Sequence, residues 1–171
     1  MICIERITTE MKFDAQSINC LLAQQSPGET QREISEEELR ESLNNPLFYL
    51  FTAVDTESNA PYKYVGMATV FFQRNLARWI AEIHDVVVDK EQRRRGIGEL
   101  LTKRLMDTAL EFSKERNIKI KLYLTSRPSR IAANTLYKKL GFVLVSKSFW
   151  GWGTNLYKII VEPTGFRGLS Q

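Results

Sequence analysis

The chain has 171 residues, of which 43% are hydrophobic and 26% are charged, a composition typical of one folded globular domain. Its two cysteines are too few for a disulfide framework, and its apolar runs are far shorter than the ~20 residues of a membrane helix. Charged residues (Glu5, Arg6 and Glu10) interrupt any apolar leader, so we expect a cytoplasmic protein with no membrane attachment.

Charge is distributed unevenly along the chain. The net charge is +4, but residues 1–60 hold 4 Lys and Arg against 11 Asp and Glu, whereas residues 90–130 hold 12 against 5. A basic segment of this kind favours an anionic ligand. The acidic segment either binds a cation or forms a solvated face.

The first half of the sequence reads mainly as strands. Ser35 and Glu38 form a capping box that predicts a helix ending near Asn44. Alternating or β-branched apolar content predicts strands, and helical spacing predicts one further helix. The strands cover Ile2–Thr8, Phe48–Asp55, Tyr64–Gln73 and Trp79–Val88, and the further helix covers Phe13–Ala23.

The second half contains the longest helical pattern, Gly96–Arg116, between the strand Trp79–Val88 and a strand over Ile118–Thr125. A strand, a helix and a strand in this order predict a right-handed crossover with parallel strands. A short helix (Ser129–Leu140) and a terminal hairpin (Phe142–Phe149 with Asn155–Val161) follow, and then a loose tail over 163–171. We therefore predict a single α+β domain with an ordered core over about residues 1–161. It is layered as α/β/α, with a mixed, mostly antiparallel sheet of six to seven strands and helices on both faces.

The basic turn after the strand Trp79–Val88 predicts an anion site. Its sequence is Arg93, Arg94, Arg95, Gly96, Ile97 and Gly98. First-turn N–H groups of a helix have no intrahelical partner, and glycine lets a ligand approach the backbone closely. We interpret this turn as a diphosphate-binding loop.

Two motifs then resemble those of one family, the GNAT N-acetyltransferases. Residues 93–98 fit its (Gln/Arg)-x-x-Gly-x-(Gly/Ala) loop, and residues 133–142 (ANTLYKKLGF) resemble its A-N-x-L-Y-x-x-x-G-F helix and strand. The order of elements agrees over about residues 1–161. The resemblance implies the acyl-CoA N-acyltransferase fold, acetyl-CoA as co-substrate, no metal, and transfer of the acetyl group to a primary amine.

The resemblance also implies roles for individual residues. The amides of residues 94–98 would hold the coenzyme A diphosphate, and the three arginines would reach the diphosphate or the 3′-phosphate. The backbone of Val86, Val87 and Val88 would bind the pantetheine arm and the thioester carbonyl. Asn134 would lie near that arm, and Tyr137 would be the acid that protonates the departing thiolate.

The base that deprotonates the amine is expected on the strand Trp79–Val88. Glu82 has the spacing to Gly96 of the catalytic glutamate in histone-lysine-acetylating relatives, and His84 is the chain's single imidazole. Even spacing along a strand places Glu82, His84, Val86 and Val88 on one face and Asp85 on the other. An ion pair with Arg74 or Arg78 is the structural alternative for Glu82, and a hydrogen-bonded core site is the alternative for His84.

The acceptor is expected to be a cationic amine, such as a polyamine, a lysine or N-terminal peptide, or an aminoglycoside. The acidic residues Glu36, Glu37, Glu38 and Glu41 would attract it, and the aromatic residues Phe149, Trp150 and Trp152 would stack on it. Those aromatics could instead form a homodimer interface. Two rival functions are a non-catalytic coenzyme A-binding regulatory module and a nucleic-acid-binding domain, although the basic helix has no recognition motif.

Overall fold

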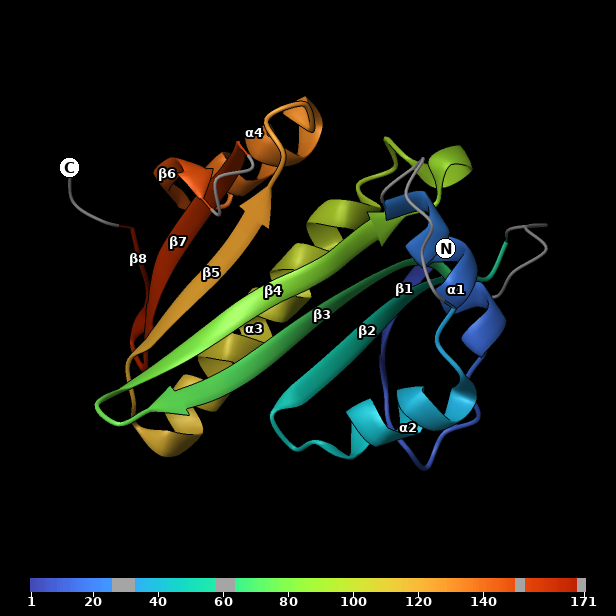
Figure 1. The fold of residues 1–171 in the computed structure, drawn as a ribbon, viewed down its shortest axis with the longest axis horizontal. Helices are drawn as coiled ribbons and strands as arrows, with labels where there is room; N and C mark the ends of the chain where they lie inside the picture. Colours follow the sequence, from blue (N-terminus) through green and yellow to red (C-terminus); the bar gives the residue numbers. More distant parts are fainter. Residues whose placement is uncertain (26–32, 58–63, 150–152, 169–171) are drawn as a thin grey trace. The chain divides into compact units, whose positions relative to one another are not determined.

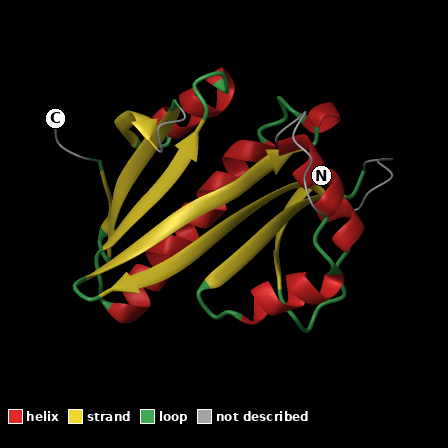
Figure 2. Cartoon of the chain, in the orientation of Figure 1, coloured by secondary structure: helices red, strands yellow, loops and turns green. Residues whose placement is uncertain are grey.

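The computed structural model describes residues 1–25, 33–57, 64–149 and 153–168. Its strands are β1 (Ile2–Ile7), β2 (Phe48–Asp55), β3 (Tyr64–Asn75), β4 (Arg78–Val88), β5 (Ile120–Ser126), β6 (Val143–Phe149), β7 (Thr154–Glu162) and β8 (Gly165–Arg167). Its helices are α1 (Ala15–Gln25), α2 (Glu36–Asn44), the short 3-10 helix η1 (Lys90–Gln92), α3 (Ile97–Arg116) and α4 (Ile131–Lys139). Figures 1 and 2 show these elements along the chain.

The strands follow the order β1-β2-β3-β4-β5-β7-β6, and β8 pairs with β7. The β4–β5 pair is parallel, with Trp79 opposite Ile120 and Ile83 opposite Leu124, which confirms the predicted crossover. The β1–β2, β5–β7, β6–β7 and β7–β8 pairs are antiparallel. The predicted mixed, mostly antiparallel sheet is confirmed, with eight strands in place of six to seven.

The chain forms two compact units, of which unit 1 comprises residues 1–70 and 85–105. One face of its strands packs on α1 and α2, where Met67 joins Ile18, Leu21 and Leu39 in a buried apolar cluster. On the other face, a Cβ built on Gly66 would lie 3.2 Å from Ile97 Cγ2 of α3. Because consecutive strand residues point to opposite faces, the helices of unit 1 cover both sides of its strands, as predicted.

Gly66 fixes how closely α3 approaches β3. Its built Cβ would also lie 3.1 Å from the carbonyl oxygen of Val87 and 3.2 Å from Leu101 Cδ1. We therefore expect Gly66→Val to destabilise the protein by about 1–3 kcal/mol, because the added methyl groups would overpack this contact. Urea unfolding measures the loss, with Gly66→Ala as the milder comparison. Unchanged stability of the valine variant would show that α3 does not lie this close.

Unit 2 comprises residues 71–84 and 106–171. Phe72 stacks on Phe112 of α3 with ring centroids 4.1 Å apart, and Trp79 meets the same ring edge-on at 5.2 Å. Strands β5, β7 and β6 lie side by side in Figure 1, and β7 lies between β5 and β6. The rings of Tyr137 in α4 and Tyr157 in β7 pack together, with their centroids 6.0 Å apart.

The predicted loose tail is wrong for residues 165–167. The chain turns at Gly165, whose φ is 136°, and pairs back on β7, with Ile160 opposite Arg167. An ion pair of 3.0 Å between Arg167 and Glu162 closes the hairpin. The apolar pattern did not predict this hairpin because its turn depends on a backbone conformation of Gly165 that other residues rarely adopt.

Two absences hold within the described residues. None of their helices is long and apolar enough to cross a membrane. No group of three or more His, Cys, Asp or Glu side chains comes together there as a metal-binding set.

Candidate active site

The loop before α3 holds a series of backbone amides that have no partner in the described part of the chain. The predicted diphosphate loop follows η1, and Arg94 and Gly96 have φ of 64° and 78°. The first backbone bond into α3 runs from Leu100 N to the Gly96 oxygen at 3.1 Å. Within the described ranges, the amides of residues 94–98 donate no hydrogen bond to another residue. Unpaired first-turn amides with the helix dipole behind them attract an anion.

The side chains of the loop leave one face of the backbone open. Ile97 is 1% exposed and packs in the core, so its side chain fixes the helix start while its amide remains open. A Cβ built on Gly96 would meet no atom within 4 Å. A ligand can therefore approach this backbone closely at Gly96.

The three arginines have different environments. Arg95 Nη1 donates to Asp55 Oδ2 at 2.5 Å and also to Gln92 Oε1. Arg93 Nε donates to the Val88 oxygen at 3.1 Å. The exposed side chain of Arg94 contacts no partner in the described part of the chain. The sequence could not distinguish these three roles.

Asp55 was not predicted as part of the site. Its carboxylate accepts from Arg95, from the Glu57 amide at 3.2 Å and from the Met1 amino group at 3.1 Å. The Arg95 bond, followed by those to Glu57 and Met1, lowers the pKa of Asp55 from 3.8 to about 2.

This shift predicts the acid dependence of stability. Because the folded-state pKa of Asp55 lies below the unfolded value, its contribution is complete above about pH 4 and is lost as the pH falls to about 2. Urea midpoints of the wild type and Asp55→Asn should therefore differ at pH 5 and converge toward pH 2. A difference that persists at the lowest pH would contradict this assignment.

The end of β4 contains an irregularity that the sequence did not predict. Asp85 has φ of 51°, in the left-handed region, and accepts a 3.1 Å hydrogen bond from the Thr69 hydroxyl. A residue in this conformation breaks the strict alternation of a strand. The even spacing predicted to align Glu82 and His84 with Val86 and Val88 therefore does not extend past Asp85.

Beyond Asp85, the strand exposes its backbone at one edge. The Asp89 amide donates to the Val65 oxygen of β3 at 3.0 Å. Since neighbouring strand residues direct their N–H groups to opposite edges, the Val88 amide points away from β3. Val87 is buried in the unit 1 cluster, so the side chains of this segment pack while its backbone can still bind a ligand.

In unit 2, Glu82 and His84 share one face of β4, as predicted. His84 Nε2 lies 3.1 Å from Glu82 Oε2. The side chain of Glu82 is 43% exposed and that of His84 is 51% exposed, so His84 does not occupy a core site. Among the described ion pairs, Glu82 has none with Arg74 or Arg78. The two side chains form a solvent-accessible, hydrogen-bonded pair.

On α4, Tyr137 and Asn134 are both buried. Asn134 donates to the Arg127 and Arg130 oxygens at 2.9 and 2.8 Å. Its Oδ1 accepts from Asn155 at 3.0 Å and from the Tyr157 hydroxyl at 2.8 Å. These four bonds use the full hydrogen-bonding capacity of an asparagine amide. The side chain therefore ties α4 to β7.

Tyr137 is 6% exposed, and its hydroxyl has no partner among the described residues. Burial raises the pKa of Tyr137 to about 12. The phenol thus keeps its proton at any physiological pH. Its hydroxyl is therefore a protonated hydrogen-bond donor that no other described residue uses.

These elements can be compared with known proteins. The sequence matches the Acetyltransferase (GNAT) family over residues 15–142, which is more than half of the chain. The chain belongs to the GNAT acetyltransferase family. It is therefore an acyltransferase, and the predicted family is confirmed.

Solved GNAT structures share this fold. NAA60 of Arabidopsis thaliana in complex with acetyl-CoA has a TM-score of 0.68 at 18% identity, covering 96% of this chain and 100% of that chain. The ribosomal-protein-S18-alanine N-acetyltransferase of Escherichia coli has a TM-score of 0.62 at 19% identity, covering 100% of this chain and 99% of that chain. An aminoglycoside acetyltransferase from an uncultured soil metagenomic sample, in complex with sisomicin, has a TM-score of 0.62 at 21% identity, covering 81% of this chain and 86% of that chain. No curated protein matched the sequence.

Proposed function

We propose that this GNAT protein transfers the acetyl group of acetyl-CoA to a primary amine by direct attack in a ternary complex. The observation that carries the proposal is the run of amides over residues 94–98, next to the side chain of Arg94, for which the described residues provide no hydrogen-bond partner. Several neighbouring N–H donors with an exposed guanidinium beside them suit a diphosphate. Gly96 leaves the space that such a ligand needs. These residues therefore fit the coenzyme A diphosphate.

Arg94 is the arginine that we assign to the coenzyme phosphates. Arg95 is engaged with Asp55, and Arg93 donates to the Val88 oxygen. A guanidinium without a partner gains most from a phosphate because it gives up no protein contact. The diphosphate and the 3′-phosphate are both within this assignment.

When bound, acetyl-CoA supplies an activated acyl thioester. We assign the backbone of Val86, Val87 and Val88 to the pantetheine arm. The Val88 amide, which points away from β3, would donate to the thioester carbonyl oxygen. A fixed backbone donor aimed at developing negative charge is among the largest contributions to acyl-transfer catalysis.

Glu82 is the proposed base, acting directly or through water, with His84 as the alternative. Attack requires a neutral amine, because an ammonium group has no lone pair. The 3.1 Å contact between the two side chains allows one to orient the other. In a turnover assay, Glu82→Gln and His84→Asn separate the base from its partner.

Tyr137 is the proposed donor to the departing thiolate. With its pKa near 12, full transfer of its proton to a thiolate of pKa about 8.5 is unfavourable. We therefore assign Tyr137 a stabilising hydrogen bond in place of complete proton transfer. Asn134, with no open donor or acceptor, would position α4 and so Tyr137.

The acceptor that we propose is a cationic primary amine. On α2, Glu36 pairs with Arg40 at 2.9 Å and Glu38 closes the capping box. Glu37 and Glu41 are exposed and have no partner in the described residues, so they can attract a cation. Phe149 lies in β6, but Trp150 and Trp152 fall outside the described residues, so their stacking and the homodimer alternative stay predictions.

An acceptor panel tests the function. Purified protein, acetyl-CoA and a peptide with a free N-terminus, a lysine peptide, a polyamine or an aminoglycoside are mixed, and release of free thiol is followed. We expect amine-dependent release with at least one member. Acetyl-CoA binding without turnover, unchanged in Tyr137→Phe and Glu82→Gln, would indicate the regulatory module instead. Salt-dependent binding of DNA or RNA without acetyl-CoA binding would indicate the nucleic-acid domain.

A further inference from the structure

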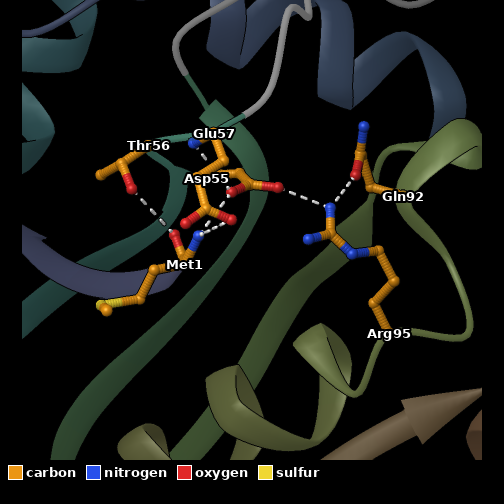
Figure 3. A network of polar contacts seen from close by, with 6 residues as sticks. All are labelled: Met1, Asp55, Thr56, Glu57, Gln92 and Arg95. Carbon is orange, nitrogen blue, oxygen red and sulfur yellow. Dashed lines mark hydrogen bonds and ion pairs between the residues drawn. The ribbon is translucent and has the colours of Figure 1, made fainter.

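We infer that Asp55, at the end of β2, is a positioning residue that holds the diphosphate loop in its binding conformation through Arg95. This inference rests on the proposed function. Asp55 and Arg95 are 40 positions apart in the sequence, and their contact belongs wholly to unit 1. Figure 3 shows the Arg95 guanidinium between the Asp55 carboxylate and the Gln92 amide.

The loop needs such an anchor because its backbone is strained. Arg94 and Gly96, on either side of Arg95, both have positive φ. A non-glycine residue in the left-handed region is unfavourable by about 1–2 kcal/mol and persists only when its surroundings fix it. Arg95 lies between these two residues, and its side chain reaches β2, a strand distant in the sequence, so it can fix both neighbours.

Asp55 is built to hold an arginine. Its side chain is 2% exposed, so the carboxylate cannot easily exchange Arg95 for water. The amide of Glu57 and the amino group of Met1 orient the same carboxylate. A buried carboxylate with fixed partners presents a rigid acceptor, whereas the Arg95 side chain is 43% exposed at the loop.

The contact also determines which arginine serves the ligand. The Arg95 guanidinium is paired with Asp55 and is therefore not available to a phosphate. Its neighbours Arg94 and Gly96 are the residues that we propose to bind the phosphate. Arg94 is then the arginine that is left to bind the coenzyme phosphates. Asp55 would thereby improve coenzyme affinity although it carries the same sign of charge as the ligand.

The test is a double-mutant cycle of Asp55→Asn and Arg95→Met, with acetyl-CoA affinity measured by calorimetry. We expect each single variant to weaken binding about tenfold, and the double variant to be no weaker than either, since both remove one anchor. The KM for acetyl-CoA should rise in each, while kcat at saturating acetyl-CoA and the KM for the amine stay near wild type. Asp55→Glu should restore part of the affinity.

Other outcomes overturn the inference. Tighter binding in Asp55→Asn would mean that the carboxylate acts only by repelling the ligand. A loss in Arg95→Met that adds to that of Asp55→Asn would mean that Arg95 contacts phosphate directly. If Asp55→Asn does not fold, Arg95→Met, altered at a half-exposed side chain, still gives the affinity and the KM split. Absence of acetyl-CoA binding by the wild type would refute the proposed function, whereas wild-type binding with unchanged variants would refute this inference alone.

Discussion

Replacing Gly96 by alanine should weaken acetyl-CoA binding by about tenfold or more while the protein stays folded. The φ of Gly96 is 78°, where an L residue is unfavourable by about 1–2 kcal/mol, equivalent to roughly a tenfold change in affinity if the loop relaxes. A new methyl group would also occupy the open space that we assign to the ligand. Calorimetric titration with acetyl-CoA measures the effect.

Gly153 provides a matched control for Gly96. It has a φ of 63°, and a built Cβ likewise meets nothing within 4 Å. Gly153→Ala should therefore lower thermal stability by a similar amount and leave acetyl-CoA affinity unchanged. Equal loss of affinity in both variants would show that the effect is general strain. Unchanged affinity in Gly96→Ala would remove this loop from the coenzyme site.

Tyr137→Phe should lower kcat by about 10- to 100-fold, at or below the roughly 100-fold that proton-transfer groups contribute at least, because a thiolate is already a good leaving group. The substitution removes one hydroxyl that has no partner in the described structure, so stability should change little. The KM for both substrates should stay near wild type. Steady-state kinetics at saturating acetyl-CoA measures the change.

Tyr157 provides the control, because it lies 6.0 Å from Tyr137 but uses its hydroxyl within the protein. Tyr157→Phe loses the hydrogen bond to Asn134 and should cost about 1 kcal/mol of stability, with kcat close to wild type. The pH–rate profile of the wild type should show no loss of the Tyr137 proton below about pH 10, since its pKa is about 12. Normal kcat in Tyr137→Phe would exclude it as the donor.

Most of the fold could be predicted because its signals are local. The capping box of Ser35 and Glu38, the β-branched and aromatic content of β2 and the glycine-bearing start of α3 each depend on residues within a few positions of one another. The candidate site followed from two short motifs for the same reason. Tyr137, Asn134 and the loop amides could be named from those motifs alone.

The features that could not be predicted depend on contacts distant in sequence or on backbone geometry. Nothing local in the sequence indicates that Asp55 meets Arg95, or that Thr69 stabilises the positive φ of Asp85. The four hydrogen-bond partners of the Asn134 side chain lie in the loop before α4 and in β7. Residue types named the candidates, and the tertiary structure then showed that Arg95 is paired with Asp55 and that all four hydrogen-bonding positions of the Asn134 amide are used within the protein.

The most direct test of the central claim follows the acetyl group itself. The protein is mixed with acetyl-CoA, with and without the acceptor that is active in the panel, and both protein and acceptor are analysed by mass spectrometry. Direct attack predicts one acetyl group on the amine, and an unmodified protein whether or not the amine is present. An acceptor that is never acetylated, or a protein that first takes up the acetyl group and then passes it on, would contradict the account.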